Sequence, residues 1–392
     1  MKIKDIVTLT TTSITPQSNE EYHLYSLPSF DDNQKREELI GSEIQSNKYT
    51  VPDKCILFNK LNVRFKRVWR IDNNDYNKIC STEFLPLVVN ESKVDYQYCY
   101  YILISDYITN YLCGQNANTS GSHKRIDPTD FLNIELPTLP AMEEQKRIGQ
   151  LLFSLDQKIA LNRAINDNLE AMAKQLYDYW FVQFDYPNEE GKPYKSSGGK
   201  MVWNEKLKRE IPEGWEVLLV GDILDKVQNT PRLATNEYMT NGQYPIIDQT
   251  ANIYYAGFTD REDAVSKQFP AVVFGDHSCA VKYVNFPFVR GADGTQIMLS
   301  KDDRISVEYL YFAIKNIPLR EGYARHYSIL KEAYIIAPPT SIAKLYQKVA
   351  AKQFEMITCN RKDIISLSKQ RDELLPLLMN GQVSVNYHLS HD

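Results

Sequence analysis

The chain has 392 residues, enough for two or three domains, and 43% hydrophobic with 24% charged residues is ordinary for a folded protein. Its formal net charge of −5 gives no general affinity for nucleic acid, so any such function has to come from local basic patches. No apolar run approaches the ~18 residues of a membrane span, and the first residues lack a signal-peptide core. We therefore expect a cytoplasmic protein with no membrane partner.

The six cysteines are scattered, with no Cys-x-x-Cys pair and no Cys/His cluster. This spacing favours free thiols in a reducing compartment and predicts no bound metal.

Residues 1–137 predict a first globular domain. Short apolar runs at 55–58, 68–71 and 84–89 are separated by Asn, Asp and Pro, which is typical of short strands and turns. We expect a helix at 96–111 to follow these strands.

A basic stretch lies within this domain, between Lys54 and Arg70. It has six basic residues, no acid and three interleaved aromatic residues. Such density suits neutralisation of phosphates, although a solvated charged face is the common alternative. The residues that we predict to contact DNA are Lys60, Arg64, Lys66 and Arg67.

A polar loop at 118–125 combines small hydroxyl residues, a glycine and cationic side chains. It could approach a phosphate through backbone N–H groups and hydroxyls, or it could be an ordinary surface loop. The candidate DNA contacts here are Ser120, Ser122, His123, Lys124 and Arg125.

Residues 138–184 predict one long helix. Apolar residues recur at alternating spacings of four and three, which places them on the seam of a coiled coil. A single helix of this length cannot bury its own stripe, so it needs a partner helix. The predicted seam residues are Leu152, Leu155, Ile159, Asn162, Leu169 and Leu176.

A linker rich in Pro, Gly and Ser is expected at 185–210, followed by a second globular domain at 211–337. Apolar runs at 244–247, 271–274 and 286–289 predict strands, and 308–316 predicts a helix that repeats the one at 96–111. His277 follows Asp276, a pair that could act as a general base, but no nucleophile or metal-ligand set accompanies it. We predict DNA contacts instead, at His277, Lys282, Arg325 and His326.

A second long helix is predicted at 338–385. Moving the first stripe 198 positions along the chain, from Asn162 to Asn360, places most of its apolar residues on apolar residues and Pro140 on Pro338. The second half of the seam is predicted at Ile357, Asn360, Ile364, Leu367 and Leu374.

This duplication predicts an α+β chain with two globular α/β domains separated by two long helices. The helices are expected to pack as an antiparallel coiled coil about an internal pseudo-two-fold. Asn162 would then face Asn360 across the axis, a polar pair that fixes register; the alternative places both asparagines in solvent.

Catalytic signatures are missing from the sequence. It has no GxxxxGK phosphate loop, no GxGxxG for a dinucleotide or methyl donor, and no Asn-Pro-Pro-Tyr-like stretch to hold a flipped base. We therefore predict no catalytic residues and no cofactor.

Several motifs resemble the specificity subunit of a Type I restriction–modification system. They are LPAMEEQKRI from Leu139, YWFVQF from Tyr179, GKPYK from Gly191 and IPEGW from Ile211, in that order over nearly the whole chain. The resemblance implies two target-recognition domains that each read one half of a split, asymmetric site in double-stranded DNA. It also implies that the helices space these domains and dock two methyltransferase subunits, with restriction subunits as a possible further partner.

The second half departs from this pattern. The segment APPTSI from Ala337 lacks the Glu-Glu-Gln of the first helix start, so the two docking surfaces need not be equal. The two domains also differ in their motifs, which predicts two unlike half-sites. A coiled-coil scaffold that binds proteins but no DNA is the alternative function.

Overall fold

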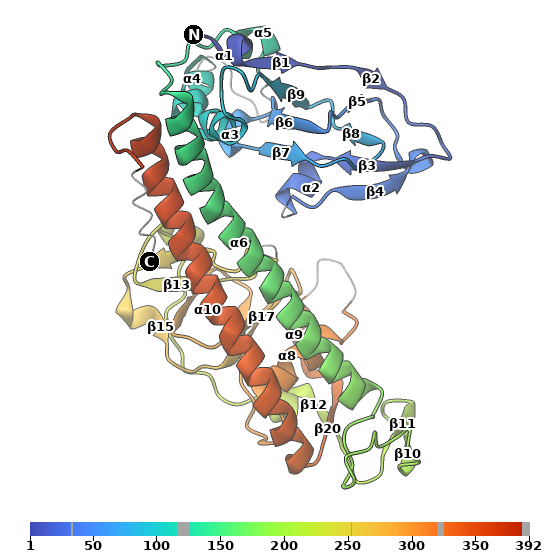
Figure 1. Cartoon of the computed structure of the whole chain (residues 1–392). Coiled ribbons are helices and arrows are strands. Elements are labelled where there is room, and N and C mark those ends of the chain that lie inside the picture. The colour runs from blue at the N-terminus through green and yellow to red at the C-terminus, as the bar shows by residue number, and fades with distance from the viewer. Residues whose placement is uncertain (33, 116–124, 252, 320–324, 386–392) are drawn as a thin grey trace, which may run out of the picture. The chain divides into compact units, whose positions relative to one another are not determined.

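The structure of the protein, a computed structural model, describes residues 1–32, 34–115, 125–251, 253–319 and 325–385 (Figure 1). The chain forms two compact units. Unit 1 comprises residues 1–160 together with 364–392, and unit 2 comprises residues 161–363. Each unit therefore contains one globular domain and one half of each long helix, so the units cut across the boundaries predicted from the sequence.

Both predicted long helices are present. Helix α6 spans Met142–Tyr177 and continues into a π turn, η3, at Asp178–Val182, while helix α10 spans Thr340–Met379. The start of α6 is fixed by the buried Gln145 side chain, which donates to the carbonyl oxygen of Pro140 and accepts from the backbone N–H of Asp95, both at 2.9 Å. The start of α6 is thereby fixed to the globular domain of unit 1.

Gly149 is the one glycine within α6, and its position has a packing reason. A Cβ at this residue would lie 3.0 Å from the backbone nitrogen of Tyr98 and 2.9 Å from an Asp95 carboxylate oxygen. Glycine in a helix costs about 1 kcal/mol relative to alanine. Here it allows α6 to approach the start of helix α3 (Tyr96–Ile104) closely.

Within each unit, α6 and α10 lie side by side with opposite chain directions (Figure 1). In unit 1, Glu144 accepts from the backbone of Val385, and Asp156 accepts from Arg371, so positions rise on α6 as they fall on the other segment. In unit 2 the order is the same, since Asn166 bonds to Asn360 and the Trp180 ring lies against Tyr346. The antiparallel pairing predicted from the duplication is therefore confirmed.

Most predicted seam positions are buried or half-buried. Leu152, Leu155, Ile159 and Ile357 are buried, while Leu169, Leu176, Ile364, Leu367 and Leu374 are half-buried. The predicted pairing of Asn360 with Asn162 is wrong. Asn360 Nδ2 instead donates to Oδ1 of Asn166 at 2.9 Å, and Asn166 lies one helical turn beyond Asn162. The heptad pattern allows both alignments, and only the packing of the two helices on their domains selects between them.

The globular part of unit 1 contains two sheets. A four-stranded sheet has the order β1-β9-β6-β7, and a five-stranded sheet has the order β2-β5-β8-β3-β4. Their strands are β1 Val7–Leu9, β2 Ser13–Ile14, β3 Glu21–Tyr25, β4 Glu37–Ile40, β5 Lys48–Thr50, β6 Lys54–Asn59, β7 Val68–Asp72, β8 Lys78–Cys80 and β9 Phe84–Val89. The short helices are α1 Ile3–Ile6, α2 Leu27–Asp31, α4 Asp106–Gln115 and α5 Pro128–Leu132, with turns η1 Gly41–Glu43 and η2 Val63–Phe65.

The predicted helix at 96–111 is divided into α3 and α4. Ser105 ends α3 with extended backbone (ψ 154°), and its hydroxyl donates to the carbonyl oxygen of Ile102 at 2.6 Å. A serine hydroxyl that bonds to the preceding turn competes with helix continuation, which explains the break.

The globular part of unit 2 contains a four-stranded sheet of order β14-β13-β18-β15, a three-stranded sheet of order β17-β16-β19, and the pair β12-β20. The antiparallel strands β10 and β11 form a hairpin at the end of the predicted linker and just after it. The strands are β10 Met201–Asn204, β11 Arg209–Pro212, β12 Glu216–Leu219, β13 Tyr244–Ile247, β14 Gly257–Thr259, β15 Val265–Ser266, β16 Ala271–Gly275, β17 Val281–Val284, β18 Phe288–Arg290, β19 Thr295–Met298 and β20 Tyr334–Ala337. The other elements are α7 Val220–Ile223, α8 Val307–Lys315, α9 His326–Lys331, η4 Thr235–Glu237 and η5 Glu262–Ala264.

The duplication extends to the contacts between each domain and its part of α6. Tyr101 of α3 donates its hydroxyl to Asp156 at 2.6 Å, and Tyr311 of α8 donates its hydroxyl to Glu170 at 2.7 Å. Burial alone would raise the pKa of Glu170, but Lys315 and Tyr311 together hold that pKa below its ordinary value. Each domain is thus fixed to the helix by a tyrosine–carboxylate contact as well as by apolar packing.

Candidate nucleic-acid interface

The basic stretch of unit 1 folds as the antiparallel strands β6 and β7 joined by η2. Asn62 and Lys66 flank η2 with left-handed backbone, φ 55° and 44°. The turn exposes Phe65, and the guanidinium groups of Arg64 and Arg67 lie 4.9 and 5.0 Å from its ring centroid. An exposed ring flanked by two cations is a surface that suits phosphate contact and base stacking.

Three of the predicted DNA contacts in unit 1 are paired with acids from elsewhere in the chain. Lys66 Nζ lies 2.7 Å from Asp106. Arg67 donates two hydrogen bonds of 2.7 Å to Asp31. Arg125 donates in the same bidentate way to Glu83.

These acids reduce the positive charge that the stretch offers to a ligand. Lys60 and Arg64 are different, since neither forms an ion pair with any described residue of the chain. The other loop candidates, Ser120, Ser122, His123 and Lys124, lie outside the described residues.

Unit 2 has a polar pocket of about 550 Å³ beside the turn that follows β16. Gln249 organises this turn: its amide accepts from the backbone of His277 at 3.2 Å and donates to the carbonyl oxygen of Asp293 at 2.9 Å. Gly294 has φ +84°, a conformation that favours glycine. The pocket is lined by Arg232, Asp276, His277, Asp293, Gly294, Gln296 and Arg325.

The pocket contains donors from arginine and histidine, an amide, and two carboxylates. Such a mixture suits recognition of a base edge, which presents donors and acceptors side by side. Of the residues predicted from sequence in unit 2, His277 and Arg325 are exposed and lie in the pocket.

The other two predictions in this unit do not fit a DNA contact, because both side chains are buried. Lys282 is 6% exposed, donates to the carbonyl oxygen of Ile253 at 2.7 Å and lies 3.7 Å from Asp248. Burial lowers the pKa of Lys282 to about 8, although Asp248 opposes the shift. His326 is 1% exposed, and its Nδ1 lies 2.8 Å from the carbonyl oxygen of Asp276. Neither can reach a phosphate in this conformation.

Sequence reasoning missed Arg232 and Gln296. Both lie far along the chain from the His277 turn, and neither belongs to a basic run or a recognisable motif. In the sequence, the residues from Gly291 to Gly294 indicate a turn, and Gln296 follows it closely. This turn was the one sequence feature that pointed to Gln296.

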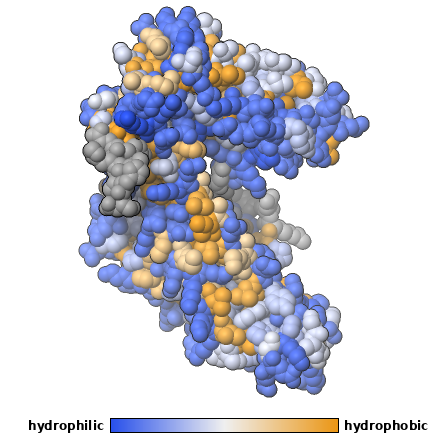
Figure 2. All heavy atoms as spheres, viewed as in Figure 1, coloured by the Kyte–Doolittle hydropathy of each residue, from blue (hydrophilic) through white to orange (hydrophobic). Residues whose placement is uncertain are grey.

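The long helices of unit 2 carry exposed apolar side chains. Leu161 and Met172 on α6 are 60% and 57% exposed, while Leu345 and Met356 on α10 are 44% and 52% exposed. Each pair is eleven residues apart, about three turns, so its members share one helix face. Figure 2 shows apolar side chains gathered over the long helices on the face that it displays. Exposed apolar side chains mark a protein-docking surface where they form a contiguous patch.

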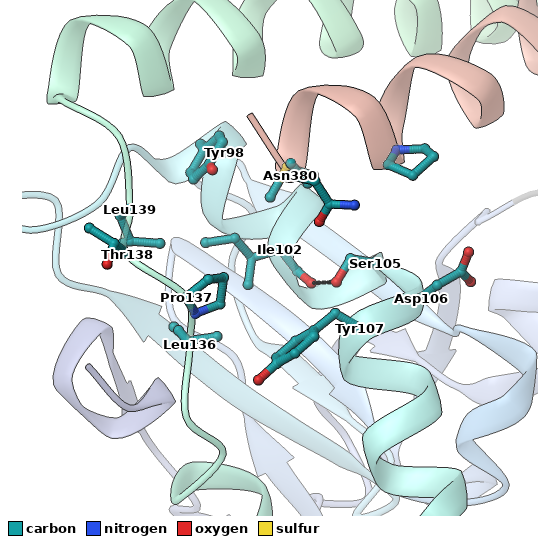
Figure 3. A pocket seen from close by; sticks show the side chains of 12 residues that line it. Tyr98, Ile102, Ser105, Asp106, Tyr107, Leu136, Pro137, Thr138, Leu139 and Asn380 are labelled. Atoms are coloured by element: carbon teal, nitrogen blue, oxygen red, sulfur yellow. Dashed lines mark hydrogen bonds between the residues drawn. The ribbon is translucent and has the colours of Figure 1, made fainter. Parts of the chain in front are cut away.

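A second pocket, of about 270 Å³, lies in unit 1 between α3, the segment 136–139 and the end of α10 (Figure 3). Tyr98, Ile102 and Leu139 give it an apolar lining. Its one lining serine, Ser105, bonds to the backbone of Ile102, as the dashed line in Figure 3 shows.

Two further properties bear on the kind of site. Among the described residues, no three or more His, Cys, Asp or Glu side chains are grouped in a way that could hold a metal ion. No described helix is both long enough and apolar enough to cross a membrane.

Comparisons with a family model and with known proteins point to the same family. The sequence matches the family model described as Type I restriction modification DNA specificity domain over residues 1–171 and 212–369. It is 26% identical over 333 residues to the Type I restriction enzyme MjaIX specificity subunit of Methanocaldococcus jannaschii, covering 79% of this chain and 74% of that protein. It is 24% identical over 398 residues to the HindI specificity subunit of Haemophilus influenzae, covering 84% and 86%.

A solved structure has a similar fold. The crystal structure of a Type I restriction–modification S subunit from M. genitalium aligns with a TM-score of 0.57 at 15% identity, covering 96% of this chain and 95% of the other. At this identity the likeness concerns the fold alone.

Proposed function

Because the chain belongs to the family of Type I restriction–modification DNA specificity domains, we propose that it is a non-catalytic specificity subunit whose two domains each read one half of a bipartite DNA site. The observation that carries the proposal is the family match itself. It falls in two segments, 1–171 and 212–369, and each contains one globular domain followed by much of one long helix. In this proposal each segment supplies one reader.

Two linked readers solve a problem of specificity. A wrong base pair costs roughly 1–3 kcal/mol, so one small domain discriminates weakly among many competing sites. Once the first domain is bound, binding of the second domain is intramolecular. The free-energy penalties for wrong base pairs in the two half-sites therefore add. The two domains present different side chains, which supports an asymmetric site.

In unit 1 we assign DNA contact to Lys60 and Arg64, whose charges no acid among the described residues neutralises, and to the exposed Phe65. In unit 2 we assign it to the polar pocket around His277 and Arg325. The arginine and lysine residues would position the backbone, while amide and histidine groups would face the bases.

The long helices supply the partner surface in this proposal. Exposed Leu161, Met172, Leu345 and Met356 would dock a methyltransferase subunit, and the repeat of the helix predicts a second such subunit. Base modification would then be carried out by the partner, which has to flip the base out of the duplex. Restriction subunits would join the same complex.

DNA binding by the full chain tests the proposal. Fluorescence anisotropy with random-sequence duplex should show affinity that falls steeply with salt, in the chain alone or with its methyltransferase partner. K60A/R64A should reduce the salt slope, whereas K348A, which removes an exposed charge from α10, should not. If the affinity does not change with salt, either for the chain alone or with its methyltransferase partner, a protein-binding scaffold is favoured instead.

Methylome mapping tests whether each domain reads its own half-site. Replacing residues 1–137 with the first domain of a relative should change one half-site and leave the other intact. Inserting four residues into both helices, about one turn each, should lengthen the gap between half-sites. An exchange that altered both half-sites would contradict the modular assignment.

A further inference from the structure

Two of the loops that line the polar pocket of unit 2 join the ends of different sheets. Strands β13 and β18 are parallel neighbours in the four-stranded sheet, while β16 and β19 are antiparallel neighbours in the three-stranded sheet. His277 follows β16, and Asp293 lies between β18 and β19. The shape of the pocket therefore depends on the contacts that hold these loops together.

Gln249, two residues beyond the end of β13, connects the two loops with its side chain. Its Oε1 accepts from the backbone N–H of His277 at 3.2 Å, and its Nε2 donates to the carbonyl oxygen of Asp293 at 2.9 Å. These partners fix the orientation of the amide, because the N–H requires its oxygen and the carbonyl requires its NH₂ group. The carbonyl oxygen of Gln249 also accepts from the Ser278 hydroxyl. Gln249 thus holds the two loops at three points.

Two glycines leave the space that Gln249 occupies. A Cβ at Gly275, the last residue of β16, would lie 2.8 Å from the Cβ of Gln249. A Cβ at Gly294 would lie 2.9 Å from Oε1 of the same glutamine. At these distances a larger residue at either position would displace the glutamine side chain. The contacts of Gln249 are therefore part of the close packing of the loops.

Gln249 is half-buried and does not itself line the pocket, whereas both partners of its side chain do. The turn that it holds also bears on a further lining residue, since Asp293 Oδ1 lies 3.7 Å from Nη1 of Arg232. A base edge is read by donors and acceptors in a defined arrangement. Such groups have to be held within about 0.5 Å of their productive geometry by the residues behind them.

We propose that Gln249 is a positioning residue for base recognition: by holding His277 and Asp293, it determines which base pair unit 2 accepts at one position of its half-site. The proposal rests on the DNA-recognition function proposed above. A positioning residue differs from a phosphate contact in its effect. Loss of a phosphate contact weakens binding to all sequences alike, whereas loss of positioning weakens the discrimination between sequences.

The test uses the full chain and the variant Q249M, which keeps the length of the side chain and removes both amide groups. Methylome mapping of the unmodified chain with its methyltransferase partner gives the site, and the exchange of residues 1–137 shows which half unit 2 reads. Duplexes with that site, and with single base-pair changes in each half, are then compared by fluorescence anisotropy. A wrong base pair ordinarily lowers affinity by roughly 5- to 150-fold, and Q249M should reduce this factor to below about 3-fold at one position of the half-site of unit 2.

Gln268 provides a matched control in the same unit. It is also half-buried, and its amide likewise bridges two backbone groups, since it accepts from the N–H of Gln228 and donates to the carbonyl oxygen of Lys226. None of these three residues lines the pocket. Q268M should therefore leave the recognised sequence and the mismatch factors unchanged. Equal relaxation in Q268M and Q249M would overturn the proposal, because general loosening of unit 2 would explain both.

Two readouts separate positioning from a purely structural role. Q249M should keep the salt slope for random-sequence duplex, because no phosphate contact is lost, and it should keep the discrimination in the other half-site. A uniform loss of affinity for every duplex, with the mismatch factors intact, would overturn the proposal, since Gln249 would then serve the fold alone. If Q249M does not fold, S278A decides, because it removes one contact to Gln249. S278A should relax one position of the same half-site, and intact mismatch factors in S278A would overturn the proposal.

The failures of the two proposals are distinguishable. An unmodified chain without salt-dependent binding to DNA would refute the DNA-recognition function, and the positioning role would fall with it. An unmodified chain that reads two half-sites, with a folded Q249M that keeps every mismatch factor, would refute the positioning role only.

Discussion

Phe354 of α10 closes the core of unit 2, so its replacement by alanine should destabilise that unit strongly. The side chain is 2% exposed. Its ring is stacked on Tyr283 at 4.1 Å between centroids and lies 5.4 and 5.9 Å from the rings of Tyr311 and Phe312. Aromatic pairs contribute roughly 0.5–1.5 kcal/mol each beyond area burial. With the transfer and cavity terms, F354A should cost about 3–5 kcal/mol of unfolding free energy.

Met356, two residues later on the same helix, provides the matched control. It is 52% exposed, so M356A should change the unfolding free energy by less than about 0.5 kcal/mol. Urea denaturation followed by circular dichroism measures both variants. In a thermal scan, F354A should lower the transition of unit 2 by on the order of 10 °C. M356A should leave that transition in place.

The two variants should also differ in partner binding. M356A removes part of the proposed docking surface and should weaken association with the methyltransferase subunit, as measured by analytical ultracentrifugation of the folded proteins. A cost for F354A no larger than that for M356A would refute the reasoning, because α10 would then not contribute to the core of unit 2.

Three further predictions concern polar groups at the helices and in unit 2. The pKa of Lys282 is about 8 in the folded protein against 10.5 ordinarily, so the unfolded chain binds more protons between these values and stability rises with pH there. Urea denaturation of the unmodified chain and K282M should therefore show the unmodified chain gaining on the variant from pH 8 to 10; parallel curves would mean a solvated lysine. D156A removes a half-buried carboxylate that accepts from Arg371 at 2.9 Å, and it should cost about 3 kcal/mol in urea denaturation, with a cost below ~1 kcal/mol showing a screened surface pair. A double-mutant cycle of N166A and N360A should give a coupling of at least ~0.5 kcal/mol, whereas additive effects would show that the two amides do not interact.

The sequence determined the elements that depend on local pattern. The alternation of fours and threes produced two helices close to their predicted bounds, and the apolar run at 84–89 is strand β9 without change. The 198-residue duplication also gave the antiparallel pairing within each unit. These features were predictable because periodicity and turn residues act over a few positions, and the same pattern in two places indicates the same packing.

Tertiary structure decided which charges are free and which polar groups meet. Asp31 and Asp106 neutralise Arg67 and Lys66 from about 40 positions away, where no local pattern indicates them. Lys282 is buried, although the sequence predicted it as a DNA contact.

Asn360 meets Asn166 rather than Asn162, and a backbone bridge between Leu233 and Gly291 joins two distant segments of unit 2. In each of these cases the outcome depends on long-range packing. A heptad pattern leaves the alignment of two helices open by whole turns, and a charge run does not specify the acids that fold against it. The burial of each domain on its part of the long helices removes that freedom.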